Sequence, residues 1–211
     1  MGFSILAINP GASSTKVALF DDESLLWSET VYHPQEELSA FGSVFEQRDY
    51  RLKAVLSLCR EHGLDLRSLS AVVGRGGVLD PMEGGTYAVN EAMLQDLARG
   101  KPWEHASNLG GVLARLIGEM AGVLSCVVAD VSVDEFEPIS YVTGLPELPK
   151  RSLSHALNIK AVVRRASREL GGRPEDFDFV VAHLGSGVSV CAHRRGRMID
   201  VNNANEFGPM S

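Results

Sequence analysis

The sequence predicts an α/β protein made of two related units, and three features of the chain lead to this fold class. Short apolar runs alternate with stretches of helical periodicity, which is the order of elements in an α/β fold. A strand-turn-strand pattern occurs twice, with Gly11 and Gly185 at equivalent places, an offset of 174. The chain has 211 residues, of which 45% are hydrophobic and 22% charged, so it can bury a substantial core.

The first third of the chain predicts three strands and one helix. Apolar runs separated by polar turns are typical of strands, and they occur at residues 4–8, 16–20 and 25–32. Apolar side chains then recur at helical spacing before Gly63, which predicts a helix over 48–62.

The remainder alternates between strands and helices. The apolar runs at 71–73 and 124–129 are typical of buried strands. Asn90 can cap a helix that ends at Gly100. Two further helices are predicted over 108–120 and 156–170.

The internal repeat relates residues 5–17 to residues 179–191. In both copies an apolar strand ends in one polar residue, Asn9 or His183, and then passes a turn of small residues. Any two β-hairpins can look alike, but repetition over this distance favours duplicated domains.

The repeat continues beyond the turn. The strand that follows carries a hydroxyl group, Thr15 or Ser189, and a third strand comes next, over 25–32 or 197–201. The first copy is then followed by several helices and strands, whereas the second reaches the end of the chain soon after its third strand. We therefore expect a complete first domain and a second domain that is cut short.

Small residues in both turns favour phosphate binding, because Gly, Ala and Ser let backbone N–H groups approach an anion closely. Neither turn is a GxxxxGK[ST] loop or a GxGxxG turn that enters a helix. A single turn of this kind is more often an ordinary hairpin. Two such turns can hold one polyphosphate from both sides.

The composition argues against a membrane span and a nucleic-acid partner. No apolar run approaches the roughly 20 residues of a membrane span, and no basic segment precedes the first apolar run, so we expect a cytoplasmic protein. The net charge of −7 opposes a polyanionic partner. Three cysteines that lie far apart are expected to be buried, reduced thiols, namely Cys59, Cys126 and Cys191.

Seven segments of the chain resemble the butyrate kinases in order and spacing. They are residues 9–16, 74–77, 83–87, 104–111, 154–158, 182–187 and 200–204, and they extend over essentially the whole chain. The resemblance implies the ribonuclease H-like or actin-like ATPase fold of the acetate and sugar kinase superfamily. It also implies an N-terminal acyl-substrate and phosphate-binding domain over 1–150. Residues 151–211 would then hold a connecting helix and the opening β-hairpin unit of a truncated nucleotide-binding domain.

The resemblance further implies a phosphate site built by the two turns, with Mg²⁺ as the metal and ATP as the co-substrate. Asn9 and Asp130 are the implied metal-site residues. The residues implied to bind phosphate or nucleotide are Asn9, Gly11, Ser13, Ser14, Thr15, Lys16, His183, Gly185, Ser186 and Gly187.

Arg75, His155 and Asp130 are the residues implied for catalysis, and Arg75 and His105 those for the acyl substrate. A planar guanidinium can grip an oxyanion through two hydrogen bonds, and the glycines beside Arg75 leave room for a ligand. Imidazoles such as those of His105 and His155 can donate to phosphate oxygens. Taken alone, such residues more often form a surface ion pair or a structural histidine contact. Asp130 ends an apolar strand, where α/β proteins bind ligands.

Asp134 and Glu135 are weaker candidates for the same acidic site. A solvated acidic turn explains them equally well.

The implied reaction is in-line transfer of the γ-phosphoryl group of ATP to butyrate, or to a similar short-chain or branched fatty acid, which gives an acyl phosphate. A carboxylate is ionised at neutral pH, so no general base is needed. Acetate or propionate is the alternative acceptor, and a catalytically silent fragment or assembly module is the alternative function. Full-length butyrate kinases continue into an adenosine pocket and a dimer interface, so we expect the 211-residue chain alone to be inactive and the full-length enzyme to be a homo-oligomer.

Overall fold

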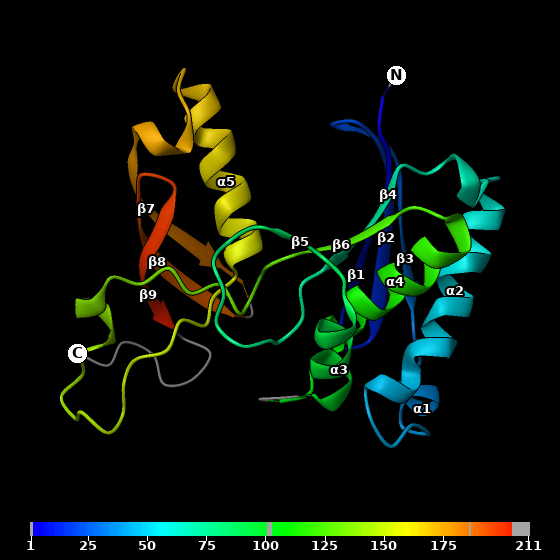
Figure 1. Cartoon of the computed structure of the whole chain (residues 1–211), viewed down its shortest axis with the longest axis horizontal. Helices are drawn as coiled ribbons and strands as arrows, with labels where there is room; N and C mark the ends of the chain where they lie inside the picture. The colour runs from blue at the N-terminus through cyan, green and yellow to red at the C-terminus, as the bar shows by residue number, and fades with distance from the viewer. Residues whose placement is uncertain (1, 101–102, 186, 204–211) are drawn as a thin grey trace. The chain divides into compact units, whose positions relative to one another are not determined.

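The structure is a computed structural model, and it describes residues 2–100, 103–185 and 187–203. Its contacts divide the chain into two compact units (Figure 1). The first unit comprises the residues up to Leu79 together with Thr86–Val128, and the second comprises Asp80–Gly85 together with the residues from Ala129 onward. The functional boundary expected at residue 150 stays a prediction. No helix among the described residues is long and apolar enough to cross a membrane.

Within the described residues, the first unit contains a six-stranded sheet with the order β3-β2-β1-β4-β6-β5. Strands β1, β4 and β6 are parallel, and the other neighbours pair antiparallel. The strands are β1 (Ser4–Pro10), β2 (Ser14–Asp21), β3 (Ser24–Tyr32), β4 (Ala71–Arg75), β5 (Thr86–Ala88) and β6 (Leu124–Val128). The five strands predicted in this region are confirmed. The short β5 was not predicted, because three residues carry no readable periodicity.

The helices predicted over 48–62, over 108–120 and between Asn90 and Gly100 are confirmed, whereas the short helical elements of the first unit were not predicted. Asn90 accepts a hydrogen bond from the N–H group of Met93, and Gly100 ends the helix in the left-handed conformation, so both predicted caps of α3 are confirmed. The helical elements are α1 (Gln35–Leu38), η1 (Phe45–Gln47), α2 (Arg48–Glu61), η2 (Leu66–Ser68), α3 (Glu91–Arg99), η3 (Ala106–Asn108) and α4 (Leu109–Ala121).

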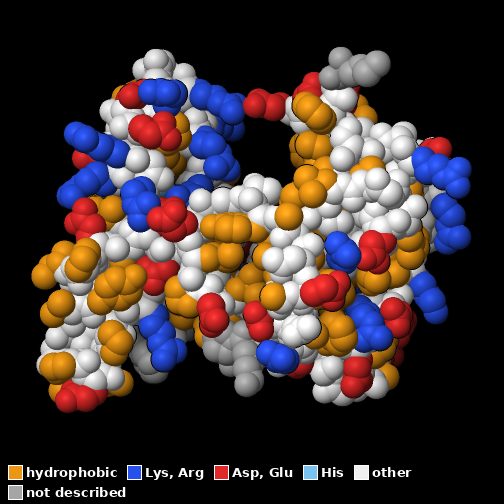
Figure 2. All heavy atoms as spheres, viewed as in Figure 1, with side chains coloured by type: hydrophobic (Ala, Val, Ile, Leu, Met, Phe, Trp, Pro, Cys, Tyr) orange, Lys and Arg blue, Asp and Glu red, His pale blue; other side chains and the backbone are white. Residues whose placement is uncertain are grey.

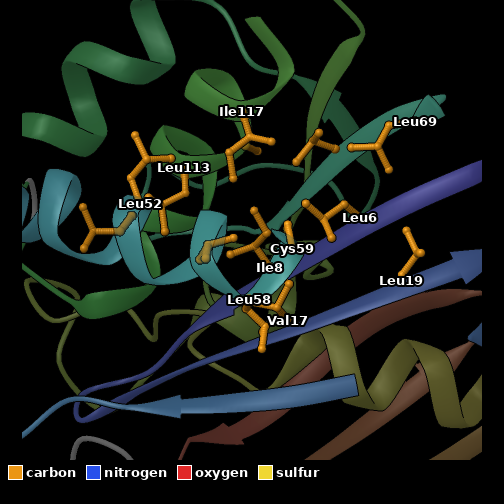
Figure 3. Close-up of a cluster of buried hydrophobic side chains, with 14 residues drawn as sticks. Leu6, Ile8, Val17, Leu19, Leu52, Leu58, Cys59, Leu69, Leu113 and Ile117 are labelled. Carbon is orange, nitrogen blue, oxygen red and sulfur yellow. The ribbon is translucent and has the colours of Figure 1, made fainter. Parts of the chain in front are cut away.

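The core of the first unit lies between the sheet and the helices α2 and α4 (Figure 3). Leu6 and Ile8 from β1 are buried against Leu113 and Ile117 from α4. Each such side chain contributes about 1.5–3 kcal/mol when it leaves water. Other members of the cluster are Val17, Leu19, Leu52, Val55, Leu58, Cys59, Leu69, Val72, Leu109 and Ala114.

Two glycines let α4 approach β4 at backbone distance. A Cβ atom built on Gly74 would lie 2.1 Å from the carbonyl oxygen of Gly110, and one built on Gly110 would lie 2.1 Å from the carbonyl oxygen of Arg75. No side chain fits at either position unless the backbones separate. The contact therefore fixes the end of β4, and with it the backbone of Arg75, against the first turn of α4.

Substituting Gly74 with alanine is expected to destabilise the first unit by about 2–3 kcal/mol, as overpacking of a tight contact does. The measurement is urea unfolding followed by tryptophan fluorescence, because Trp27 and Trp103 both lie in the first unit. Gly42→Ala is the control in the same unit, since the nearest atoms to the added Cβ atom belong to the flexible side chain of Glu46, at 3.3–3.8 Å. Equal unfolding midpoints for the two variants would contradict the prediction.

Within the described residues, the second unit contains a three-stranded antiparallel sheet in the order β7-β8-β9. Helix α5 contacts β7, and Ile159 and Val163 on the helix are buried, as are Cys191 and Val201 on the strands. The elements are η4 (Pro138–Tyr141), α5 (Ala156–Glu169), η5 (Pro174–Asp176), β7 (Asp178–Leu184), β8 (Val188–Arg194) and β9 (Arg197–Asn203). The predicted helix and strands of this region are confirmed.

The repeat seen in the sequence is also confirmed as two three-stranded antiparallel units with the same strand order. In the first, β2 pairs with β1 and β3, and in the second β8 pairs with β7 and β9. The first strands match over their whole length, because Ser4–Pro10 and Asp178–Leu184 are offset by the expected 174.

The second turn is one residue shorter than the first. Pro10 pairs with Thr15 across residues 11–14, whereas Leu184 pairs with Val188 across residues 185–187. The predicted equivalence of Thr15 and Ser189 is therefore wrong in register. Ser189 pairs with His183 and so corresponds to Lys16, which pairs with Asn9.

The two units also differ in what covers the sheet. In the first, Leu6 is buried in the core with α2 and α4, and Pro10, four residues later in the same strand, is buried as well. Their counterparts in the second, Val180 and Leu184, are 81% and 76% exposed. The described part of the second unit thus leaves an apolar sheet face uncovered.

Candidate functional site

The candidate residues of the first unit lie at one edge of its sheet. Ile8 is in register with Gly74 in the parallel pair β1 and β4, so Asn9 and Arg75 both follow at the carboxyl ends of these strands. Ligands of α/β proteins bind at this edge of the sheet. The topology therefore brings together the first turn and Arg75, as the sequence reading required.

The first turn exposes some of its side chains and buries another. The N–H group of Gly11 donates to the carbonyl oxygen of Ser14 at 2.7 Å, which closes the turn. Asn9 and Lys16 are paired across the hairpin and exposed, and Ser13 is exposed as well. Thr15 points to the opposite face and is fully buried. Its hydroxyl group therefore lies on the core side of the turn.

Arg51, on α2, contacts this turn from the core side. Its side chain is fully buried and donates to the carbonyl oxygens of Gly11 (2.9 Å), Ser14 (3.1 Å) and Ala12 (3.1 Å). It also donates to Oγ1 of Thr15 at 3.1 Å. No role was predicted for Arg51 from the sequence. A signal was present, because Arg51 shares the buried face of α2 with apolar residues four and seven positions later.

His33 is the second buried partner of the turn. Its Nε2 atom lies 2.8 Å from Oγ1 of Thr15, and its ring is 3% exposed. Burial and the nearby positive charge of Arg51 lower the pKa of His33 from 6.5 to about 4. The imidazole is therefore neutral in the folded protein at neutral pH.

This pKa predicts that the first unit loses stability in mild acid. The unfolded chain takes up a proton below pH 6.5 and the folded one only near pH 4, so stability is complete above 6.5 and falls by about 1.4 kcal/mol per pH unit between the two values. Urea unfolding followed by tryptophan fluorescence is expected to give about 1.4 kcal/mol less for wild type at pH 5.5 than at pH 7.5. His33→Gln should lose most of that difference, and an unchanged difference would contradict the assignment.

His105 is the N-cap residue just before η3 and is exposed. Its Nδ1 atom accepts from the N–H group of Ser107 at 3.2 Å and lies 2.7 Å from the hydroxyl oxygen of the same residue. Acceptance at Nδ1 places the ring proton of the neutral imidazole on Nε2. The ring can therefore act as a hydrogen-bond donor through Nε2.

In the second unit the structure brings His155 and His183 together. Their rings are stacked with centroids 3.9 Å apart and planes inclined by 10°. The N–H group of Gly185 donates to the carbonyl oxygen of Gly187 at 3.1 Å, which closes the second turn. Ser186, also predicted to bind phosphate, lies outside the described residues.

Each of the two stacked rings has a polar partner. Nδ1 of His155 lies 2.9 Å from the hydroxyl oxygen of Ser189, and Nδ1 of His183 lies 3.0 Å from Oδ1 of Asn158. Because an amide oxygen only accepts, His183 donates to Asn158 through Nδ1. Asn158 belongs to the segment 154–158 that resembles the butyrate kinases, but no role was predicted for it.

Asp130 is buried, at 2% exposure, two residues after the end of β6. Its Oδ1 atom accepts from the N–H group of Leu157 at 3.1 Å, in the first turn of α5. A carboxylate is stabilised at a helix N-terminus by the unpaired N–H groups there. One oxygen of Asp130 therefore holds the helix that begins just after His155.

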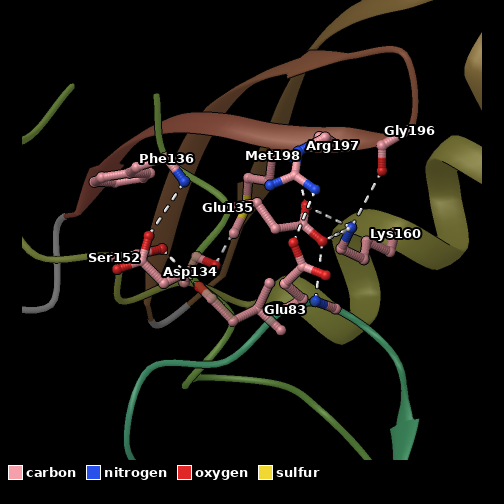
Figure 4. Close-up of polar contacts among 12 residues, drawn as sticks. Glu83, Asp134, Glu135, Phe136, Ser152, Lys160, Gly196, Arg197 and Met198 are labelled. Carbon is pink, nitrogen blue, oxygen red and sulfur yellow. Dashed lines mark hydrogen bonds and ion pairs between the residues drawn. The ribbon is translucent and has the colours of Figure 1, made fainter. Parts of the chain in front are cut away.

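Glu135 is not part of a solvated acidic turn, so that reading is wrong for this residue. It is 6% exposed and accepts from Lys160, from the N–H group of Gly84 and from that of Met198 (Figure 4). Burial raises the pKa of Glu135, but these hydrogen bonds outweigh it and hold the pKa below its ordinary value. Lys160 also donates to the carbonyl oxygen of Gly196 at 3.2 Å. The ion pair thus ties together four segments of the second unit.

Two basic side chains of α5 are exposed, and the cysteine thiols are buried as predicted. Arg164 and Arg165 lie on the exposed side of α5, and Figure 2 shows Lys and Arg side chains interspersed with acidic ones in this part of the surface. The three cysteines are free and buried. Burial raises the pKa of the Cys59 and Cys191 thiols to about 11, which makes them poor nucleophiles.

Comparison with known proteins identifies close relatives of the chain. No family model matches it. Butyrate kinase 2 of Clostridium acetobutylicum is 48% identical over 204 residues, which is 97% of this chain and 57% of that protein. A probable butyrate kinase of Coprothermobacter proteolyticus is 49% identical over 213 residues, which is 100% of this chain and 60% of that protein. The chain is homologous to the butyrate kinases over the part of their length that it spans.

The chain thus spans less than two thirds of these butyrate kinases. Solved structures add the fold. An acetate kinase from Porphyromonas gingivalis matches with a TM-score of 0.67 at 19% identity and covers 96% of this chain, which spans 57% of that one. A propionate kinase from Francisella tularensis matches with a TM-score of 0.66 at 16% identity. The predicted actin-like ATPase fold is confirmed.

Proposed function

We propose that the chain is part of an ATP-dependent carboxylate kinase, which transfers the γ-phosphoryl group of ATP to butyrate or to a similar short-chain or branched fatty acid. The observation that carries the proposal is 44–49% identity to curated butyrate kinases over nearly the whole chain. Two hairpin turns of small residues, one in each unit, support it, because small residues let backbone N–H groups approach phosphate oxygens closely.

The proposed roles follow the chemistry of each side chain. Arg75 grips the carboxylate of the acceptor or the transferring phosphoryl group through its planar guanidinium. His105 donates through Nε2 to the same charged groups, and His155 and His183 offer imidazoles beside the second turn. In-line transfer needs orientation and charge stabilisation rather than a general base, because the acceptor is already ionised.

Mg²⁺ is the proposed metal, and it would neutralise charge on the phosphates of ATP. Among the described residues no group of three or more His, Cys, Asp or Glu side chains could hold a metal ion. The absence of such a group among the described residues is compatible with Mg²⁺, because Mg²⁺ in kinases is held by one or two protein oxygens together with substrate phosphates and water. The exposed amide of Asn9 and the carboxylate of Asp130 are the oxygen donors we propose.

The test is an acyl-hydroxamate assay of the full-length gene product with Mg²⁺, ATP and butyrate, acetate, propionate or isobutyrate as separate acceptors. We expect acyl phosphate with at least one acceptor and the highest kcat/KM with butyrate or a branched acid. ATP binding without acyl transfer would instead favour a silent binding module. Preference for acetate or propionate would correct the proposed substrate.

A further inference from the structure

We propose that Arg51 is a positioning residue for the first phosphate turn, and that its buried guanidinium turns the carbonyl groups inward so that two backbone N–H groups face an anion. The inference rests on the proposed function of this turn as a phosphate site. It adds a residue that contacts the turn from the core side and does not face the ligand.

Nε, Nη1 and Nη2 of Arg51 all donate hydrogen bonds to groups of the protein itself. Its Nη1 and Nη2 atoms reach three carbonyl oxygens of the turn and one hydroxyl oxygen, at 2.9–3.1 Å. Gln47, one helical turn earlier on the chain, accepts from Nε at 3.1 Å and from Nη2 at 2.9 Å. The guanidinium is thus held flat beneath the turn and cannot itself reach a ligand.

Peptide geometry converts this arrangement into a donor pair. In a planar trans peptide, the C=O group of one residue and the N–H group of the next point in opposite directions. The carbonyl groups of Gly11 and Ala12 point to Arg51, so the N–H groups of Ala12 and Ser13 point away from it. Neither N–H group donates to another group in the part of the chain that the structure describes. Both residues are exposed, so both donors are open to an anion.

The charge of Arg51 adds to this effect. Its hydrogen-bond partners are all neutral oxygens, and no carboxylate forms an ion pair with it within the described residues. Charges in a protein interior are normally paired, because solvation is lost on burial. An unpaired cation directly behind two outward N–H groups favours an anion in front of them, as fixed donors and charges do in preorganised sites.

The test compares Arg51→Lys and Arg51→Met with wild type in the full-length protein, and uses ATP as the probe. Lysine keeps the charge but has a single ammonium group in place of the fork, so it cannot hold three carbonyl oxygens at once. We expect the Kd and KM for ATP to rise by about 10- to 100-fold, which is the loss that removal of an outer-shell partner causes at metal sites. The KM for the carboxylate should change by no more than about threefold, because only the ATP turn is altered.

Amide chemical shifts give a second measurement that does not depend on catalysis. In the free Arg51→Lys protein, the amide resonances of Ala12 and Ser13 are expected to move, while that of Gly187 in the other turn stays in place. Arg48→Lys is the matched control, because Arg48 lies on the same helix and is 38% exposed. It should bind ATP as wild type does.

The outcomes separate this inference from the proposed function. Weakened ATP binding in the Arg51 variants supports the inference even where no acyl phosphate forms. ATP affinity within about twofold of wild type in folded Arg51→Lys would overturn the inference and leave the proposed function in place, whereas a wild-type protein that does not bind ATP would overturn both. If both Arg51 variants fail to fold, Gln47→Ala takes their place. This variant removes the side-chain oxygen that accepts from Nε and Nη2 of Arg51. The same weakening of ATP binding is expected.

Discussion

In the full-length protein, Arg75→Ala is expected to lower kcat/KM for acyl phosphate formation by about 30- to 1,000-fold, which corresponds to about 2–4 kcal/mol of transition-state stabilisation. Arg75 ends β4 at the carboxyl edge of the sheet, where Asn9 also lies and where α/β proteins bind their ligands. The contact between Gly74 and Gly110 holds its backbone in place without the side chain, so the variant should keep its fold. Steady-state kinetics and urea unfolding of the same sample are the two measurements.

Arg99→Ala is the matched control for this experiment. Arg99 ends α3, is 62% exposed and forms an i,i+3 ion pair with Asp96, so its loss should leave the kinetics unchanged. Arg75→Lys should recover only part of the activity, because an ammonium group cannot bind an oxyanion in the bidentate manner. Kinetics of Arg75→Ala equal to those of Arg99→Ala would remove Arg75 from the site.

Lys160→Met is expected to destabilise the second unit by about 3–5 kcal/mol, because it leaves the carboxylate of Glu135 buried without its cation. The Lys160 and Glu135 side chains are 15% and 5% exposed, and Nζ lies 2.8 Å from Oε2. Both tryptophans belong to the first unit, so the measurement is hydrogen exchange of amides in α5 and β8. Exchange of these amides should accelerate far more than exchange in α4.

Two further variants identify the cause of that loss. Arg165→Met removes an exposed ion pair from the same helix and should cost about 0.5 kcal/mol or less. Adding Glu135→Gln to Lys160→Met removes the buried charge but keeps an acceptor for the N–H group of Met198 or Gly84, so part of the stability should return. A Lys160→Met protein as stable as Arg165→Met would show that the buried ion pair of Lys160 and Glu135 does not stabilise the second unit.

The stability that the Lys160 and Glu135 ion pair contributes depends on pH. The pKa of Glu135 is lower in the folded protein than its ordinary value of 4.5. Its stabilising effect is therefore present above that value and is lost as the pH falls through the folded pKa.

Local patterns in the sequence predicted most of the fold. Apolar periodicity placed the main strands and helices, and the caps Asn90 and Gly100 marked both ends of α3. The repeat predicted two similar hairpin units before any strand pairing was known. Local patterns could not show that one residue is missing from the second turn, because small residues fill turns of either length.

The candidate site was predicted only in part, because tertiary contacts decide which groups face a ligand. The register of β1 and β4 brings Asn9 and Arg75 to one edge, as expected. The burial of Thr15 and the support from Arg51 depend on contacts between β2 and a helix that begins more than thirty residues later. The stacking of His155 on His183 likewise joins a helix start to a strand end that are far apart in the sequence.

The difference in turn length also means that the two hairpins are not interchangeable parts. Arg51 uses three carbonyl oxygens from the four-residue segment 11–14, and a graft of residues 185–187 in its place would offer one residue fewer. The graft would bring small residues of the same kind, yet it would leave a buried guanidinium short of acceptors. Any redesign that moves a turn between the two units must therefore move the helix residue that supports it.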